Sequence, residues 1–260
     1  MNYINRRQTV KYVLSAIAGT ALMNSLLRNA SFAQAAGSPF PFKGNGEPAV
    51  FDIINSGVGG NNTVDMLKRM EKDCLIHKPK LTILMVGTND MNSVKHIPLP
   101  QYEQNLKEMV KRIKATKSKV LMMTILPCYE PDLLTRHPTA FYEPEGVSGR
   151  RKQINDVVKK IAAEHKTYLL DLEHRFLAIG KIGADRDSLI QNLANTNKRD
   201  GIHPTVNGYR FIGLTVYDFI TDHKLPASGI VCFGDSITKG DGSVDKDSYP
   251  GFLSKLLNTK

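Results

Sequence analysis

The chain has 260 residues, of which 41% are hydrophobic and 23% are charged, so it can form one sizeable globular domain or two small ones. Its formal net charge is +10 at pH 7, but no nucleic-acid-binding motif accompanies the basic residues, and a nucleic-acid partner is not expected. The composition is otherwise ordinary for a globular protein.

The first 35 residues have the features of a signal peptide. Arg6-Arg7 precede an apolar run over residues 12–27, and Ala-Gln-Ala follows at 33–35. The paired arginines resemble a twin-arginine export signal, although Thr9 stands where that pattern prefers an apolar residue. The run is too short and too interrupted by polar residues to favour a membrane-spanning helix. We therefore expect a periplasmic or extracellular protein with no stable membrane anchor after signal removal.

The basic charge falls partly on this leader, which carries four basic and no acidic residues, so the remaining chain has a formal charge of +6. One group of basic residues clusters at an expected helix and its exit: Lys107, Lys111, Arg112, Lys114, Lys117 and Lys119. This cluster is interpreted as a solvated helix face. Residues 36–48 are rich in glycine and proline and predict a flexible lead-in, and residues 49–260 are expected to form a single domain.

Short apolar runs alternate with segments of helical periodicity from residue 50 onward. Strands are predicted at 50–54, 81–86, 120–126, 168–171 and 230–233, and helices at 63–77, 101–116, 150–165, 207–223 and 249–257. Residues 129–148 are expected to form a loop over one end of the sheet, and residues 180–199 to be irregular. The alternation predicts a parallel sheet with helices on both faces.

Three cysteines are an odd number for an exported protein. Cys232 falls in the apolar run 230–233, which predicts a buried thiol. A bridge between Cys74 and Cys128 is conceivable, but their spacing does not support it.

A Gly-Asp-Ser turn directly follows the apolar run 230–233. A serine at the carboxyl end of a strand stands where an open α/β sheet places its reactive groups, which makes Ser236 the candidate nucleophile. Taken alone, Gly-Asp-Ser is more often a simple surface turn.

The segment Asp200-Gly-Ile-His203-Pro supplies a candidate base and its orienting group. The three-residue step lets the carboxylate of Asp200 reach the imidazole of His203 across a tight turn, and Pro204 keeps the histidine out of helical geometry. For His203 alone, a surface histidine at a helix start is the better interpretation. The six other histidines have no comparable setting.

Two further turns offer donors for an oxyanion. The glycine-rich turn at 57–60 follows the first strand, and Asn89 follows the second. The backbone amides of Gly60 and Ser236 and the side-chain amide of Asn89 are the candidate donors. The glycine segment could instead be a plain turn and Asn89 a simple cap, and the spacing matches neither a P-loop nor a dinucleotide fingerprint.

Together these segments resemble the blocks of the SGNH (GDSL-type) hydrolase family, which is named for a serine, a glycine, an asparagine and a histidine. Matched residue by residue, these are Ser236, Gly60, Asn89 and His203, with Asp200 three positions before the histidine. The histidine segment is especially close to the last block of the family.

The order of the blocks departs from that family, in which the serine segment comes first and not last. We interpret this as a circular permutation, which domains tolerate because their termini often lie close together. The resemblance then implies a three-layer α/β/α, flavodoxin-like SGNH hydrolase fold with a parallel five-stranded sheet. The strand at 230–233 is apolar on both faces, so we expect it between those at 50–54 and 81–86, giving the sheet order 1-5-2-3-4 in chain numbering.

For function, the resemblance implies a serine esterase that hydrolyses short-chain esters, acetyl esters above all, of carbohydrates, without a cofactor or metal. A lysophospholipase or lipase would use the same site but lacks support, because no long apolar lid segment is evident. The same blocks could also serve an acyltransferase or belong to a non-catalytic carbohydrate-binding protein. Tyr129, Phe141 and Tyr142 could form a platform for a sugar ring, or could simply pack their loop onto the domain.

Overall fold

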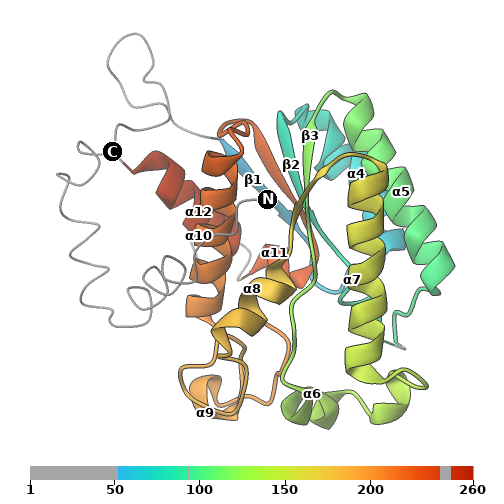
Figure 1. Ribbon diagram of the computed structural model, residues 1–260, viewed down its shortest axis with the longest axis vertical. Helices are drawn as coiled ribbons and strands as arrows, with labels where there is room; N and C mark the ends of the chain where they lie inside the picture. The colour runs from blue at the N-terminus through green and yellow to red at the C-terminus, as the bar shows by residue number, and fades with distance from the viewer. Residues whose placement is uncertain (1–51, 93, 241–246, 260) are drawn as a thin grey trace. The chain divides into compact units, whose positions relative to one another are not determined.

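A computed structural model describes residues 52–92, 94–240 and 247–259 of the chain. The expected signal peptide, the lead-in and the start of the first predicted strand lie outside these residues. Within them, a parallel sheet is covered by helices on both faces, so that the elements form three layers (Figure 1).

The sheet has the strand order β1-β5-β2-β3-β4. Its strands are β1 (Ile53–Gly57), β2 (Leu81–Met85), β3 (Lys119–Met123), β4 (Tyr168–Leu170) and β5 (Ile230–Gly234). All neighbouring strands pair in parallel. The predicted order 1-5-2-3-4 is therefore confirmed. Every residue of β5 is buried, as expected of a strand covered on both faces and both edges.

The first strand lies three residues later than predicted. Residues 50–54 are mostly apolar and predict a strand there, but β1 runs through Asn55 and Ser56 to Gly57. These polar residues pair with the backbone of β5 instead of ending the strand. Gly57 and Met85 both lie opposite Gly234, so the carboxyl ends of β1, β5 and β2 reach the same level.

Helices cover both faces of the sheet, in two sets (Figure 1). The first set is α4 (Thr63–Asp73), α5 (Leu99–Ala115) and α7 (Gly146–Glu164). The second set is α8 (Leu172–Ile179), α10 (Val206–Asp222) and α12 (Tyr249–Asn258). Shorter helical segments are η1 (Leu75–His77), α6 (Glu130–Arg136), η2 (Thr139–Phe141), α9 (Leu193–Thr196) and α11 (Ser236–Lys239).

One face of α5 is apolar and buried, and it is formed by Tyr102, Leu106, Met109, Val110 and Ile113. The apolar residues of α4 are buried to different extents. Met66 and Met70 are buried against the sheet, whereas Val64 and Leu67 are only half-buried. Asn62 caps the start of α4, accepting from the amide of Asp65, and this start point sets which residues face inward.

The prediction of a loop at 129–148 is wrong, because α6, η2 and the start of α7 lie there. The prolines that suggested an irregular segment begin helices instead. Pro131 lies in the first turn of α6, where a proline costs no hydrogen bond, and Pro138 directly precedes η2. Helix α8 was also missed, although Asp171 caps its start and Gly180 ends it in a left-handed conformation.

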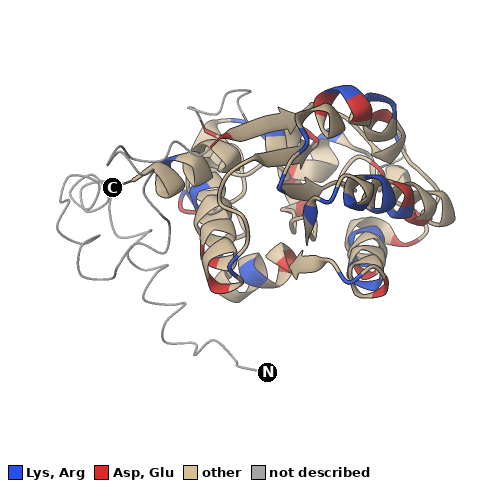
Figure 2. Ribbon diagram, turned by 90° about the horizontal axis from the view of Figure 1, so that it is seen from above, with Lys and Arg blue, Asp and Glu red and all other residues tan. Residues whose placement is uncertain are grey.

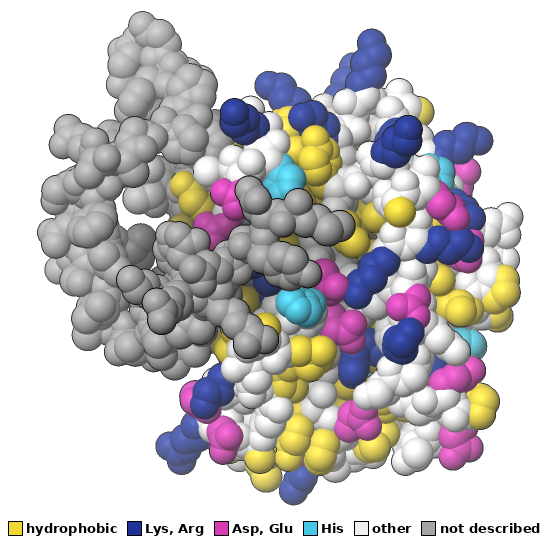
Figure 3. All heavy atoms as spheres, in the orientation of Figure 1, with side chains coloured by type: hydrophobic (Ala, Val, Ile, Leu, Met, Phe, Trp, Pro, Cys, Tyr) yellow, Lys and Arg dark blue, Asp and Glu magenta, His cyan; other side chains and the backbone are white. Residues whose placement is uncertain are grey.

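The basic cluster is a solvated face, as predicted: Lys107 pairs with Glu103 and Glu164, and Arg112 with Glu71. Acidic and basic residues are interspersed on the outer helices (Figure 2), and the face seen in Figure 3 mixes both signs with apolar side chains. All three cysteines are free, so Cys74 and Cys128 form no bridge, and Cys232 is buried. No helix in the described parts of the chain is long and apolar enough to cross a membrane.

Candidate active site

Ser236 lies at the carboxyl end of the central strand, as the first residue of α11. Asp235 precedes it, and its carboxylate Oδ1 accepts a hydrogen bond of 2.9 Å from the amide of Ile237. This cap fixes the turn that follows β5 and leaves Ser236 half-buried at its surface.

His203 is held at the start of α10 by a short antiparallel bridge between Ile190 and Pro204. The carbonyl of His203 accepts from the amide of Gln191 at 2.8 Å, and the side chain of Thr205 caps α10 by accepting from Gly208. The backbone around the histidine is therefore fixed on both sides.

Gly201 lets this segment pack against α6. Its φ is +75°, and a Cβ there would collide with the carbonyl oxygen of Tyr129 and the backbone of Leu133. The amide of Tyr129 in turn donates to the carbonyl of Gly201 at 2.8 Å. A side chain at this position would separate α6 from the histidine segment.

The structure brings Ser236, His203 and Asp200 into one chain of hydrogen-bonding contacts. Nε2 of His203 lies 3.0 Å from Oγ of Ser236. Nδ1 of the same ring lies 3.0 Å from both carboxylate oxygens of Asp200. This arrangement allows a serine to be deprotonated by an imidazole that a carboxylate orients.

The carboxylate of Asp200 is stabilised in its charged form. Partial burial alone would raise its pKa, but hydrogen bonds from the ring and amide of His203 and from the amide of Ile202 outweigh burial and lower the pKa from its ordinary value. Arg136 of α6 adds an ion pair, with 2.7 Å between its Nη1 and Oδ2 of Asp200. Sequence reasoning missed this arginine because it treated the segment of α6 as a loop.

The glycine turn and the asparagine turn are joined to each other. The side-chain amide of Asn89 donates to the carbonyl of Asn61 at 3.0 Å. Gly60 has a φ of +75°, and its carbonyl accepts from Nζ of Lys95 at 2.5 Å. Both turns begin where β1 and β2 end, level with the end of β5, so the predicted donors come from loops that adjoin the serine turn.

The three aromatic residues predicted to bind substrate occupy different environments. Tyr142 is 0% exposed and its hydroxyl shares a hydrogen bond of 2.8 Å with His137, so it packs the core and cannot form a platform. Phe141 is half-buried and packs against the same core. Tyr129 is half-buried beside the histidine segment. The packing interpretation therefore holds for Tyr142.

Two aspartates are completely buried next to these turns. Burial raises the pKa of Asp235 to about 7 and that of Asp90 to about 6. Oδ1 of Asp90 accepts from the amide and hydroxyl of Thr63, but Oδ2 of each aspartate has no hydrogen-bond partner among the described residues. Both carboxyl groups thus favour the protonated form over a wider pH range than an exposed aspartate.

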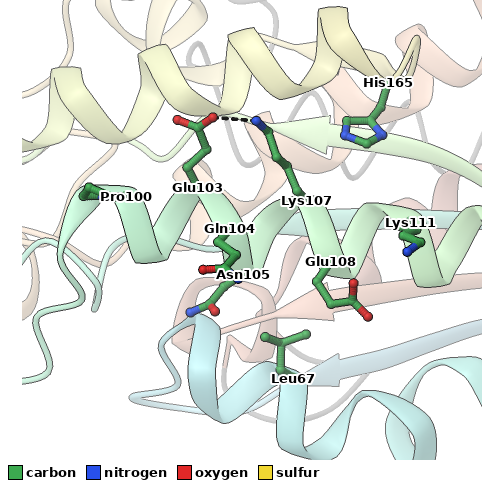
Figure 4. Close-up of a pocket in the computed structure, with 9 residues that line it drawn as sticks. All are labelled: Leu67, Pro100, Glu103, Gln104, Asn105, Lys107, Glu108, Lys111 and His165. Atoms are coloured by element: carbon green, nitrogen blue, oxygen red, sulfur yellow. Dashed lines mark hydrogen bonds and ion pairs between the residues drawn. The ribbon is translucent and has the colours of Figure 1, made fainter.

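A groove of about 740 Å³ lies elsewhere, along α5. Most of its lining residues are charged or polar, and two of them, Glu103 and Lys107, form an ion pair along α5 (Figure 4). It contains none of the residues discussed above as site candidates. Across residues 52–92, 94–240 and 247–259, no group of three or more histidine, cysteine, aspartate or glutamate residues could hold a metal ion.

Residues 42–211 match the GDSL-like Lipase/Acylhydrolase family. The chain belongs to this family. It is accordingly an enzyme that hydrolyses carboxylic esters. The matched region of this GDSL-like acylhydrolase contains the glycine, asparagine and histidine segments and ends before β5, so Ser236 lies beyond it.

Proteins from bacteria and from Homo sapiens are similar to this GDSL-like acylhydrolase. An uncharacterised lipoprotein of Bacillus subtilis, YqeF, is 28% identical over 67% of this chain and 74% of its own. An acetylxylan esterase of Geobacillus stearothermophilus is 25% identical over 62% of this chain and 68% of its own. An isoamyl acetate-hydrolysing esterase 1 homologue of Homo sapiens is also 25% identical, over 62% of this chain and 65% of its own.

Solved structures share the fold. A lipase/acylhydrolase from Enterococcus faecalis superposes with a TM-score of 0.51 at 24% identity, over 65% of this chain and 74% of its own. The acetyl xylan esterase AlAXEase gives a TM-score of 0.50 at 23% identity, over 64% of this chain and 79% of its own. The α/β fold predicted from the resemblance is thus that of SGNH hydrolases.

The burial of Asp235 predicts an unusual dependence of stability on pH. An unfolded chain loses this proton near pH 4, whereas the folded protein retains it up to about pH 7. The contribution of Asp235 to the free energy of unfolding is therefore full below pH 4 and is lost as the pH rises to about 7. Asp235→Asn keeps a side-chain oxygen that can accept from the amide of Ile237, but asparagine does not ionise. The free energy of unfolding of the variant should therefore not fall with pH at this site, and the variant should gain stability relative to wild type between pH 5 and 8.

Melting temperatures measured across this pH range test the prediction. Asp187→Asn is the matched control, because Asp187 is exposed and its ion pair with Lys181 lowers its pKa. The control should show no gain as the pH rises. Parallel curves for wild type and Asp235→Asn would contradict the prediction.

Proposed function

We propose that this enzyme is an exported serine esterase that removes acetyl and other short acyl groups, with O-acetylated carbohydrate as its substrate. The observation that carries the proposal is the unbroken series of contacts from Asp200 through His203 to Ser236.

Acylation begins at the Ser236 hydroxyl. The carboxylate of Asp200 accepts a hydrogen bond from Nδ1–H of His203, which leaves Nε2 unprotonated and able to take the hydroxyl proton. Oγ then bonds to the carbonyl carbon of the ester and forms a tetrahedral intermediate. Its collapse breaks the bond to the alcohol oxygen, which leaves with the proton from Nε2.

The negative charge on the intermediate requires donors on the other side of the carbonyl. The amides of Ser236 and Gly60 and the side chain of Asn89 are proposed for this role. One N–H bond of the Asn89 amide is used by the carbonyl of Asn61, and the second is the one assigned to the oxyanion.

Deacylation repeats these steps with water as the nucleophile. Nε2 of His203 removes a proton from water, and the hydroxide bonds to the acyl carbon. Collapse breaks the ester bond to Oγ, which recovers its proton from the imidazolium, and the carboxylic acid is released. Asp200 remains ionised throughout, because its pKa lies below the ordinary value.

The substrate part of the proposal is supported by relatives that are named acetylxylan esterases. Tyr129 is the aromatic residue best placed to contact a sugar, because its backbone is bonded to Gly201 in the histidine segment. Phe141 is retained as a second candidate. The proposed export is supported by the leader sequence and by similarity to a lipoprotein.

We also propose that the chain is a circular permutant of the family. The family match stops at residue 211, while β5 and the serine turn come later in the chain and still occupy the middle of the sheet. A serine strand moved from the beginning of the chain to its end would give this pattern.

Replacing the proposed catalytic groups should abolish or reduce turnover of p-nitrophenyl acetate. Ser236→Ala and His203→Ala should each lower kcat by a factor on the order of 10⁶. Asp200→Asn should be milder, because the backbone also fixes His203. Asn89→Ala should cost on the order of 10²–10³.

Ser228→Ala is the matched control for the serine variant, because Ser228 precedes β5 at the opposite end of the strand. It should keep wild-type activity, and all variants should keep wild-type circular dichroism spectra. Undiminished activity of Ser236→Ala would overturn the mechanism.

The acyl group and the alcohol part of the substrate can be tested separately. p-Nitrophenyl acetate should be cleaved with a higher kcat/KM than the octanoate, because no long apolar lid is evident. Tyr129→Ala should raise KM for acetylated xylan, measured by acetate release, and leave KM for p-nitrophenyl acetate unchanged. Equal efficiency on octanoate would refute the preference for acetyl esters, and an unchanged KM for xylan would exclude Tyr129 as a sugar contact.

A further inference from the structure

Arg69 of α4 has an unusual set of contacts for a residue on an outer helix. Its side chain is only 14% exposed, and its guanidinium lies 4.6 Å from the centre of the Phe233 ring of β5. Burial lowers the pKa of Arg69 from its ordinary value, while the nearby carboxylate of Asp73 opposes this effect. Removing an arginine from water is costly, so its burial calls for several compensating hydrogen bonds.

The guanidinium makes four hydrogen bonds, and three of them go to segments next to the proposed site. Nη2 donates to the carbonyl of Gly234 at 2.7 Å, and Nη1 to that of Ser56 at 2.9 Å. Nε donates to the side-chain oxygen of Asn61 at 2.6 Å. Only the fourth, from Nη1 to Asp73 at 3.2 Å, stays within the helix.

These acceptors belong to the segments that carry the proposed nucleophile and oxyanion donors. Gly234 is the last residue of β5, two positions before Ser236. Asn61 directly follows Gly60, and its carbonyl accepts from the side chain of Asn89. One side chain thus connects the serine turn, the glycine turn and, through Asn61, the asparagine turn.

We propose that Arg69 is a positioning residue of the active site, which keeps the nucleophile of the serine turn in register with the oxyanion donors of the glycine and asparagine turns. The proposal rests on the proposed function, because it needs Ser236 to attack while Gly60 and Asn89 bind the oxyanion. Arginine suits this role because its planar group donates in several directions at once. A lysine offers a single ammonium and cannot reach Asn61 and Gly234 in the same way.

A helix ion pair is the simpler explanation for Arg69. A single ion pair four residues apart on a helix stabilises a protein only slightly. Such a pair requires the contact with Asp73 alone, and does not account for the three contacts with the ends of β1 and β5 and the glycine turn. The geometry therefore favours a role in the site.

The test compares Arg69→Met, Arg69→Lys and Asn61→Ala by kcat and KM for p-nitrophenyl acetate. Small displacements of catalytic groups can cost on the order of 10²-fold in rate. We expect kcat to fall by roughly 10- to 100-fold in Arg69→Met and by a smaller factor in the other two variants, with KM changed less than about threefold. Arg112→Met is the matched control, since Arg112 pairs with Glu71 on the outer helices and should keep wild-type kcat.

A double-mutant cycle separates positioning from a general loss of stability. If Arg69 acts through the oxyanion donors, Arg69→Met and Asn89→Ala should be non-additive, with the double variant losing less than the product of the two single losses. Additive losses, or wild-type kcat in the folded Arg69 variants, would overturn the proposal. If Arg69→Met does not fold, Arg69→Lys and Asn61→Ala carry the same test, because neither removes a buried charge.

Ser236→Ala in the same assay distinguishes failure of the positioning role of Arg69 from failure of the proposed esterase function. An inactive Ser236→Ala together with fully active Arg69 variants would refute only the positioning role. An active Ser236→Ala would refute the proposed function, and the positioning role with it.

Discussion

The pairing of β5 with β1 on one side and β2 on the other is the interaction on which the rest of the structure depends. Gly57, Gly234 and Met85 lie opposite one another, so three loops start at one level of the sheet. These loops hold Gly60, Ser236 and Asn89. A shift of β5 by one residue would turn its side chains to the opposite faces and move the serine away from the other two loops.

The histidine reaches this point from a different part of the molecule. His203 lies just before α10, and its segment is fixed by the bridge between Ile190 and Pro204 and by α6, which packs on Gly201. The sheet therefore supplies the nucleophile and the candidate oxyanion donors, whereas the opposite helix layer and α6 supply the base and the groups that hold it. The contact between His203 and Ser236 joins these two halves of the site.

Much of this could be predicted from the sequence, because strong local patterns determined it. The run Ile230–Phe233 is apolar at every position, which indicates a central strand, and the spacing of Asp200 and His203 brings a carboxylate to an imidazole. Even so, the boundaries of β1 were misplaced, since Asn55 and Ser56 look like loop residues and form strand hydrogen bonds all the same.

What could not be predicted depends on contacts between distant segments. Arg136 and Arg69 appear in the sequence as ordinary helix or loop residues, and only the packing of α6 and α4 brings them to Asp200 and to the strand ends. For Tyr142 the sequence left a sugar platform and the packing of its loop as alternatives, and only the structure shows that it is buried in the core. One signal for Arg69 was available, because its position borders the helix face that Met66 and Met70 bury.

The central claim is that Ser236 is a nucleophile activated by His203. Its most direct test is to treat the protein with a fluorophosphonate, which bonds covalently to activated serines, and to locate the adduct by peptide mass spectrometry. The account predicts one adduct, on the peptide that contains Ser236, with a much lower labelling rate in His203→Ala and none in Ser236→Ala. An adduct on another residue, or labelling of Ser236 that does not depend on His203, would contradict it.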